Sequence, residues 1–194
     1  MRNLLLIRHG ATSWNQQGRY QGQTDVPLSE EGIRQGKLLA TALAHKPLDR
    51  VYSSDLTRAS QTAQFIADKH KIQVHLDKRL REFTFGVAEG LTRDSLRRKY
   101  PSNSLIPGAE TKDQVRKRVS QCINEICHQP DQLTIIVSHG GTIRQALAYF
   151  YHPAKPRKEL LIDNTGIISV EYEITHGQLC FLVKSVNNLD HLDG

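Results

Sequence analysis

Two short runs of apolar residues, each followed by a histidine, constrain the fold of this chain more than any other feature. Residues 4–7 read Leu-Leu-Leu-Ile and are followed by Arg8 and His9, and residues 133–138 lead directly into His139. Uniformly apolar runs of this length are typical of strands that are buried on both faces of a parallel sheet. The carboxyl ends of parallel strands lie at one edge of the sheet, where ligands bind. We therefore expect His9 and His139 to lie close together at that edge.

Apolar runs alternate with amphipathic helical patterns along the chain, and this alternation defines the expected fold class. The patterns predict helices at residues 29–44, 56–70, 92–100, 111–128 and about 140–151, and further strands at 50–53, 72–76, 166–174 and 179–186. The last two strands flank the turn residues His176 and Gly177 and are typical of a hairpin. Strands that alternate with helices form a sheet covered on both faces. We predict a single α/β domain over residues 1–194, with three layers (α/β/α), a mainly parallel central sheet and at least one antiparallel strand.

Composition argues against several other classes of protein. The chain has 38% hydrophobic and 24% charged residues, as soluble globular proteins do, and no run approaches the roughly 20 apolar residues of a membrane-spanning helix. A formal net charge of +6 suits an anionic ligand, whereas 6% aromatic residues offer no stacking platform for nucleic acid. The three cysteines form no CxxC pair, which indicates neither a disulfide framework nor a metal site. We expect a cytoplasmic protein with no nucleic-acid or membrane partner.

Positively charged and polar side chains follow three of the predicted strands. Arg8 and His9 follow the first strand, Arg58 lies in the first turn of the helix after the second, and His139 follows the strand at 133–138. Two guanidinium groups and two imidazoles close to helix N-termini would form a strong phosphate pocket. Each residue alone is more typical of an ordinary surface or core position, and the chain has no glycine-rich nucleotide loop.

Five motifs in a fixed order are much more specific than any one of them. They are Arg-His-Gly-Ala-Thr-Ser-Trp-Asn (8–15), Pro-Leu-Ser (27–29), Ser-Ser-Asp-Leu-Thr-Arg-Ala-Ser-Gln-Thr-Ala (53–63), Leu-Arg-Glu-Phe (80–83) and Ser-His-Gly-Gly (138–141). Through them, residues 4 to about 144 resemble the histidine phosphatase superfamily, which includes the cofactor-dependent phosphoglycerate mutases. The resemblance implies a phosphatase that forms a phosphohistidine intermediate and needs no metal and no cofactor.

The resemblance also implies roles for individual residues. His9 would be the nucleophile that attacks phosphorus. Glu82 would protonate the leaving oxygen and later accept a proton from water. Three further catalytic residues would bind the phosphoryl oxygens: Arg8, Arg58 and His139. The implied substrate-binding residues are Asn15, Gln21, Gly22 and Gly140.

Three functions stay open at this point. We favour hydrolysis of a small phosphorylated metabolite, such as α-ribazole 5′-phosphate or a sugar phosphate, because residues 90–108 lack the long insertion typical of phosphoglycerate mutases. The second function is that of a 2,3-bisphosphoglycerate-dependent mutase, which must keep water away from the phosphohistidine. The third is a non-catalytic module that binds a phospholigand or nucleic acid, and the presence of His9 and Glu82 argues against it. The apolar edge of the C-terminal hairpin is compatible with a homodimer.

Overall fold

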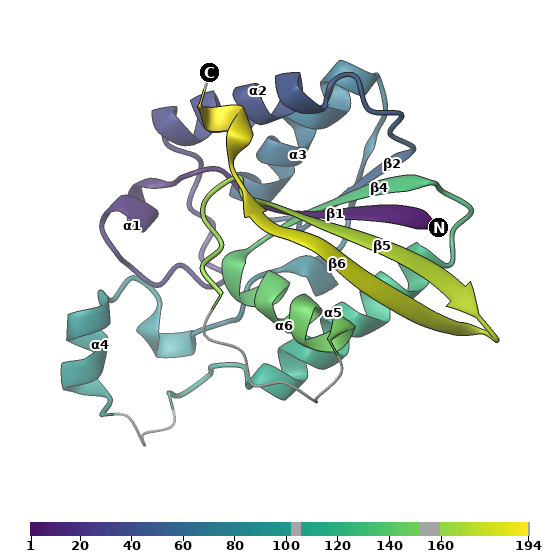
Figure 1. Ribbon diagram of the computed structural model, residues 1–194. Helices are drawn as coiled ribbons and strands as arrows, with labels where there is room; N and C mark the ends of the chain where they lie inside the picture. The colour runs from purple at the N-terminus through teal and green to yellow at the C-terminus, as the bar shows by residue number, and fades with distance from the viewer. Residues whose placement is uncertain (102–105, 152–159, 194) are drawn as a thin grey trace.

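The computed structural model describes residues 1–101, 106–151 and 160–193, which fold around one central sheet of six strands (Figure 1). The order across the sheet is β3-β2-β4-β1-β5-β6. The strands are β1 (Arg2–Arg8), β2 (Arg50–Ser53), β3 (Val74–Leu76), β4 (Leu133–Ser138), β5 (Ile167–Thr175) and β6 (Gln178–Asn188). Strands β1 to β4 pair in parallel, whereas β5 runs antiparallel to β1 and to β6. The sheet is therefore mainly parallel and carries an antiparallel hairpin, which confirms the predicted fold class.

Helices cover both faces of this sheet. Figure 1 shows α2 and α3 on one face, α5 and α6 on the other, and α4 away from the sheet. The helices are α1 (Ser13–Gln16), α2 (Glu30–Leu43), α3 (Thr57–His70), α4 (Arg93–Lys99), α5 (Lys112–Cys127) and α6 (Gly140–Phe150), with short 3₁₀ helices at Lys78–Leu80, Gly86–Ala88 and Asp190–Leu192. The longer helices lie within a few residues of their predicted ranges. The sequence analysis did not find α1 or the 3₁₀ helices, since each is shorter than the window in which a periodic pattern can be recognised.

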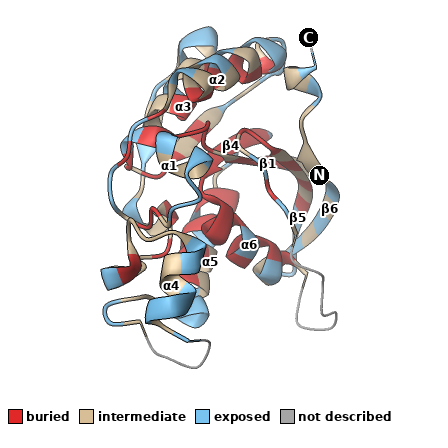
Figure 2. Ribbon diagram, turned by 90° about the vertical axis from the view of Figure 1, so that its left-hand side faces the viewer, coloured by how far each residue is buried: buried red, intermediate tan, exposed pale blue. Residues whose placement is uncertain are grey.

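The first strand, β1, contributes side chains to both hydrophobic cores. Leu4 and Leu6 pack in the core that includes residues of α5 and α6, and Leu5 and Ile7 pack in the core formed with α2 and α3. Successive side chains of a strand point to opposite faces, so that a continuous apolar run can be buried on both. Figure 2 shows these buried residues in red along β1 and β4, in the middle of the molecule. The core thus holds the ends of β1 and β4 at one edge of the sheet, with Arg8 opposite Ser138 in the pairing register.

A close approach between two backbone segments fixes the loop after β1. A Cβ on Gly10 would lie 2.5 Å from the carbonyl oxygen of Gly32, and a Cβ on Gly32 would overlap the carbonyl oxygen of Ala11. Ser29 caps α2 by accepting a hydrogen bond from the Gly32 amide, and its own amide donates to the carbonyl of Ala11. The loop that carries His9 therefore rests directly on the first turn of α2.

This contact makes a prediction about stability. In an open helix position, replacing glycine with alanine stabilises by up to about 1 kcal/mol. At Gly32 the added methyl group would overlap backbone, so we expect Gly32→Ala to lower the free energy of unfolding by about 2 kcal/mol, as overpacking does. Urea denaturation measures the change, with Lys37→Ala on the exposed face of α2 as the control. A Gly32→Ala protein as stable as the control would show that the loop and the helix do not touch.

Two further findings concern the surface of the molecule. No helix in the described part of the chain is both long and apolar enough to cross a membrane. Strand β6 lies at the edge of the sheet, where Leu182 is exposed. A homodimer through this edge stays a prediction.

Candidate active site

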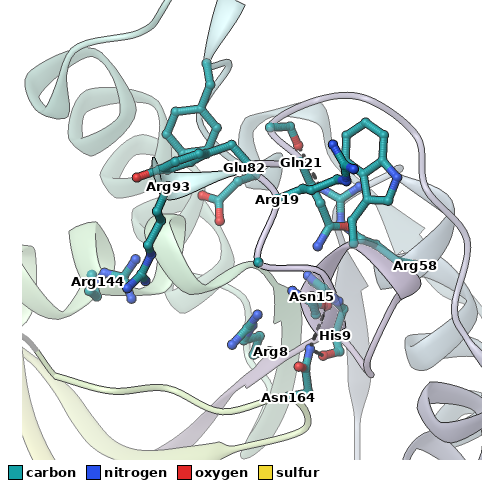
Figure 3. A pocket seen from close by; sticks show the side chains of 15 residues that line it. Arg8, His9, Asn15, Arg19, Gln21, Arg58, Glu82, Arg93, Arg144 and Asn164 are labelled. Carbon is teal, nitrogen blue, oxygen red and sulfur yellow. Dashed lines mark hydrogen bonds between the residues drawn. The ribbon is translucent and has the colours of Figure 1, made fainter. Parts of the chain in front are cut away.

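One cavity of about 480 Å³ lies at the edge of the sheet where β1 ends (Figure 3). Of the predicted site residues, those that line it are Arg8, His9, Asn15, Gln21, Gly22, Arg58 and Glu82. His139 and Gly140 are not among the lining residues. They form the start of α6 directly after β4, and His139 is completely buried. The structure therefore brings together residues from β1, α3 and the start of α6, as the positions of the strand ends predict, and adds the loop around Glu82, which only the family resemblance had indicated.

His9 is held in one tautomer. Its Nδ1 donates a hydrogen bond to the carbonyl oxygen of Gly10 at 2.7 Å, which leaves the lone pair on Nε2. Burial is the main cause that holds the pKa of His9 well below its ordinary value of 6.5, and the nearby Arg58 and Arg8 lower this pKa further. The imidazole is therefore neutral, as a nucleophile must be.

Two guanidinium groups flank the cavity, that of the buried Arg58 and that of the half-buried Arg8. The Nη2 and Nη1 atoms of Arg58 donate to the carbonyl oxygens of Gly22 at 2.7 Å and Thr24 at 2.9 Å, and Nη1 of Arg8 donates to Ile162 at 2.7 Å. The Nε atoms of both arginines are buried and have no hydrogen-bond partner among the described residues. Burial lowers the pKa of Arg58 to about 10, so that the group stays cationic at neutral pH. Buried unpaired donors on cations are costly, and an anion that accepts from them removes this cost.

His139 lies behind His9. Their ring centroids are 5.1 Å apart. Both ring nitrogens of His139 are buried and have no partner in the described part of the chain. Burial, followed by the charge of Arg58, holds the pKa of His139 well below its usual range. The expected meeting of His9 and His139 is thus confirmed, and the pair adds two more unsatisfied polar atoms to the same site.

The carboxylate of Glu82 is fixed at the N-terminus of α6. Its Oε2 accepts from the amide of Gly141 at 2.9 Å, and its Oε1 accepts from the amides of Thr142 and Phe83, each at 3.0 Å. Amides at a helix N-terminus have no partner within the helix, and the helix dipole there favours an anion. Oε2 has fewer donors than Oε1 and is the oxygen with more capacity for a proton or a ligand.

Arg118 of α5 holds the segment that carries Glu82. Its Nη1 donates to the carbonyl oxygens of Arg79 at 2.7 Å and Arg81 at 2.6 Å, and its Nη2 donates to that of Glu82 at 2.9 Å. The same guanidinium donates twice to the carboxylate of Glu110, from Nε and Nη2, each at 2.9 Å. All of its donors are therefore engaged, and no other described side chain binds the backbone of residues 79–82 at so many points. The sequence analysis did not find Arg118, because its contacts join residues far apart in the chain.

Arg118 is consequently a positioning residue for Glu82, and this has a testable result. We expect Arg118→Gln to lower kcat for an alkyl phosphate about tenfold, part of the roughly 10²–10⁴ that a general acid contributes. Hydrolysis of p-nitrophenyl phosphate should change much less, because p-nitrophenolate leaves without full protonation. Steady-state kinetics on both esters measures the ratio, with Arg116→Gln on the same helix as control. An equal loss on both esters would show that Arg118 only supports the fold.

The four residues predicted to bind the substrate differ in where the structure places them relative to the cavity. Asn15 lines the cavity, and its Oδ1 accepts from the amide of Thr12 at 3.0 Å, which leaves its Nδ2 as a donor. The Oε1 of Gln21 is buried without a partner among the described residues. Gly22 has a positive φ of 56°, and its carbonyl holds Arg58. The Cβ position of Gly140 lies 3.6 Å from Nε of Arg8, so this glycine is next to Arg8, although a methyl group there would be in ordinary van der Waals contact.

The sequence analysis missed several residues of the cavity. Asn164 lines it and donates from Nδ2 to the carbonyl oxygen of His9 at 2.9 Å. The polar run at residues 163–166 before the hairpin was the available signal, because a strand that pairs antiparallel with β1 starts at the edge of the sheet where β1 ends. Arg19, Arg93 and Arg144 also line the cavity and come from three separate segments. Within the described ranges, no group of three or more histidine, cysteine or acidic residues could hold a metal ion.

The pKa values of the two histidines predict how stability depends on pH. Both are lowered in the folded protein, so that below pH 6.5 the unfolded chain binds protons that the folded protein excludes. Their contribution is therefore complete above about pH 6.5 and is lost as the pH falls, by up to about 1.4 kcal/mol per pH unit for each histidine. Urea denaturation between pH 7 and pH 5 measures this slope. His139→Asn should reduce it and His45→Asn, an exposed control, should not; equal slopes would contradict the assignment.

The site combines the edge of a parallel sheet, a neutral imidazole and unsatisfied guanidinium groups. This combination is typical of α/β enzymes that bind a phosphoryl group at the ends of parallel strands. A family model of the histidine phosphatase superfamily (branch 1) matches residues 4–184. The chain belongs to this superfamily, and it is an enzyme of the phosphatase type.

Several similar proteins support the assignment to this superfamily, and the activities given in their names differ. A probable phosphoglycerate mutase of Yersinia pestis is 32% identical over all of this chain and 96% of the relative. The solved structure of a mycobacterial glucosyl-3-phosphoglycerate phosphatase aligns with 96% of this chain and 99% of its own, with a TM-score of 0.83 and 27% identity. A phosphoserine phosphatase from Entamoeba histolytica, in complex with 3-phosphoglyceric acid, covers 99% of this chain and 100% of its own, with a TM-score of 0.80 and 30% identity.

Proposed function

We propose that the protein hydrolyses small phosphomonoesters in two steps through a phosphohistidine on His9. The observation that carries this proposal is the hydrogen bond from Nδ1 of His9 to the Gly10 carbonyl, which leaves the Nε2 lone pair in a cavity that Arg8 and Arg58 also line. A neutral nucleophile next to fixed positive charge is the arrangement that phosphoryl transfer requires.

In the first step, Nε2 of His9 forms a bond to phosphorus while the bond from phosphorus to the ester oxygen breaks. The proton of the Glu82 carboxyl goes to the leaving oxygen and produces an alcohol. The guanidinium groups of Arg8 and Arg58 neutralise the charge on the remaining phosphoryl oxygens, and the neutral ring of His139 donates a hydrogen bond to one of them. In the second step, a water molecule attacks phosphorus, Glu82 takes its proton, and the bond between Nε2 and phosphorus breaks. Inorganic phosphate leaves, and both residues return to their starting states.

Turnover of p-nitrophenyl phosphate in the presence of excess EDTA tests this proposal. We expect release of phosphate, and a phosphate adduct on His9 after an alkaline quench that preserves phosphohistidine. Turnover that EDTA abolishes, or an adduct on another residue, would overturn the metal-independent phosphohistidine route.

A second candidate function is that of a phosphoglycerate mutase, and the 32% identity to a probable phosphoglycerate mutase favours it. The lining of the cavity includes the exposed residues Arg19, Arg93 and Arg144, so that water can enter it. Access of water to the phosphohistidine favours hydrolysis over the mutase reaction. Incubation with 3-phosphoglycerate and a trace of 2,3-bisphosphoglycerate separates the two. A hydrolase releases one phosphate for each ester consumed, whereas a mutase forms 2-phosphoglycerate and releases little phosphate.

A further inference from the structure

The carboxylate of Glu89 is half-buried, does not line the cavity and has no part in the proposed chemistry. It accepts five hydrogen bonds. Its Oε1 accepts from the amides of Gln23 at 3.0 Å and Phe85 at 3.1 Å, and from the hydroxyl of Thr84 at 3.3 Å. Its Oε2 accepts from the amide of Thr24 at 2.9 Å and from the hydroxyl of the same residue. These donors belong to two loops that are remote from each other in the chain.

The first loop, residues 21–25, holds the guanidinium group of Arg58. Nη2 of Arg58 donates to the carbonyl oxygen of Gly22, and Nη1 donates to that of Thr24. The carbonyl of Gly22 and the amide of Gln23 belong to one planar peptide group, in which C=O and N–H point in opposite directions. Arg58 and Glu89 therefore bind the two ends of a single peptide group, and each hydrogen bond polarises the other.

A close approach at Gly22 shows how tightly Glu89 is packed on the first loop. A Cβ on Gly22 would overlap the carboxylate of Glu89. The backbone of Gly22 also has a positive φ of 56°, which disfavours any other residue. Glycine at position 22 thus allows the contact between the loop and Glu89.

The second loop, residues 82–86, carries the general acid Glu82. Glu89 binds this loop two and three residues after Glu82, at Thr84 and Phe85. Arg118 binds the carbonyl oxygens of residues 79, 81 and 82, so that the two side chains fix opposite ends of the segment around the acid. Gln23 also joins the two loops, because its Nε2 donates to the carbonyl oxygen of Glu82 at 3.2 Å.

The charge of Glu89 is required by its partners, since all of those in the described part of the chain are donors. Burial raises the pKa of Glu89, but hydrogen bonds from Thr24, Gln23 and Phe85 outweigh burial and hold this pKa below its ordinary value of 4.5. The group is therefore an anion at neutral pH. Both oxygens accept from a backbone amide, so that a glutamine at this position, in either orientation, would turn its NH₂ group toward a donor.

We propose that Glu89 is a positioning residue that fixes Arg58 and Glu82 relative to each other, because one carboxylate binds the loops that hold both. This inference rests on the proposed hydrolase function and adds to it a residue outside the cavity. The two effects can be separated by the leaving group. Arg58 acts on the phosphoryl group of every ester, whereas Glu82 matters most where the leaving oxygen needs a proton.

Two esters and a double substitution test this role. We expect Glu89→Gln to lower kcat/KM about tenfold for p-nitrophenyl phosphate, part of the roughly 10²–10³ that one donor to the phosphoryl group contributes. For glycerol 3-phosphate, an alkyl ester that also needs Glu82, we expect a loss of about a hundredfold. In the Arg58→Lys background, Glu89→Gln should lower kcat/KM for p-nitrophenyl phosphate less than about twofold, because residues that act through one another are not additive. Glu171→Gln, which removes an ion pair with Lys184 away from the cavity lining, is the matched control.

The double substitution distinguishes positioning from general support of the fold. A loss on p-nitrophenyl phosphate that is the same in both backgrounds, or no loss at all, overturns the proposal. Equal losses on the two esters overturn the link to Glu82. If Glu89→Gln does not fold, Thr24→Val replaces it, since this change removes only the hydroxyl donor to Glu89. Thr24→Val should lower kcat/KM for p-nitrophenyl phosphate about threefold in the wild-type background and not in Arg58→Lys; equal effects in both would overturn the proposal.

Failure of the proposed function has a separate signature. If the wild-type protein hydrolyses neither ester, that function fails, and calorimetry with inorganic phosphate then tests Glu89 alone. Glu89→Gln must weaken phosphate binding about fivefold in the wild-type background and leave it unchanged in Arg58→Lys. Equal weakening in both backgrounds, or none in the first, would overturn the positioning role.

Discussion

Replacing His9 with alanine is expected to abolish turnover, with a fall in kcat of about 10⁴-fold or more, because the bond to phosphorus has no other atom to form on. The phosphate adduct should disappear together with the activity. Binding should survive, since Arg8 and Arg58 do not depend on the His9 ring for their positions: they are held by carbonyl oxygens of Ile162, Gly22 and Thr24. Steady-state hydrolysis of p-nitrophenyl phosphate and calorimetry with inorganic phosphate measure the two quantities.

The matched control for this substitution is His128→Ala. His128 caps the C-terminus of α5, is exposed, and is not among the residues that line the cavity. His128→Ala should keep full activity. A His9→Ala protein that stays folded and retains a tenth or more of the activity would contradict a covalent role for His9 and favour direct attack by water.

Arg58→Lys is expected to reduce kcat/KM by about 10²–10³-fold, although it keeps the charge. Arg58 is fully buried and uses two of its nitrogens on the carbonyl oxygens of Gly22 and Thr24 while Nε stays free. A lysine ammonium is a single point charge and cannot serve these two carbonyls and a phosphoryl oxygen in one plane. The loss should fall mainly on kcat, because the charge of the transition state is what the third donor stabilises.

Arg34→Lys provides the comparison for Arg58→Lys. Arg34 is a surface residue of α2 that forms an ion pair with Glu31 at 2.8 Å. Exposed pairs of this kind contribute less than about 1 kcal/mol, so that neither activity nor stability should change measurably. Thermal unfolding of both variants completes the experiment. A normal kcat in Arg58→Lys would mean that charge alone, and not the geometry of the guanidinium, acts at this position.

The site combines features that do not favour stability in the absence of an anion. Two arginines, whose Nε atoms have no partner among the described residues, and two histidines with lowered pKa values gather at one edge of the sheet. The backbone carbonyl oxygens that hold Arg8 and Arg58, and the packing of the loop after β1 on Gly32, keep these groups in place. An anion that binds to the folded protein alone should therefore raise its melting temperature, as ligand linkage requires.

Much of the fold could be predicted because it is local. The run at residues 4–7 and β4 are apolar enough to be strands buried on both faces, and the periods of α2, α3, α5 and α6 are long enough to be recognised. The rule that parallel strands end at one edge brought His9, Arg58 and His139 together without any contact being known. Glu82 could not be placed in this way, because it lies in a segment without a period. Only the family resemblance indicated it.

Other parts of the site depend on long-range contacts that a sequence does not show. Arg118 is an ordinary polar position of an amphipathic helix until the segment at residues 79–82 is folded against it. Asn164 lies before an antiparallel strand, and its place beside His9 follows from the pairing of β5 with β1. Arg93 and Arg144 belong to two helices whose relation to one cavity is set by tertiary packing alone.

The sequence by itself determined the fold class, the family and the identity of the groups that can bind and transfer a phosphoryl group, because these depend on local periods and on the chemistry of side chains near strand ends. The tertiary structure decided the tautomer of His9, the fixing of Glu82 by α6 and Arg118, and the gathering of Arg93 and Arg144 at the cavity. The fixing of Glu82 and the gathering of the arginines depend on distances between segments remote in the chain, and such distances exist only once the hydrophobic cores on both faces of the sheet have formed. The tautomer of His9 depends on the conformation of the loop at Gly10, which is fixed by its contact with α2.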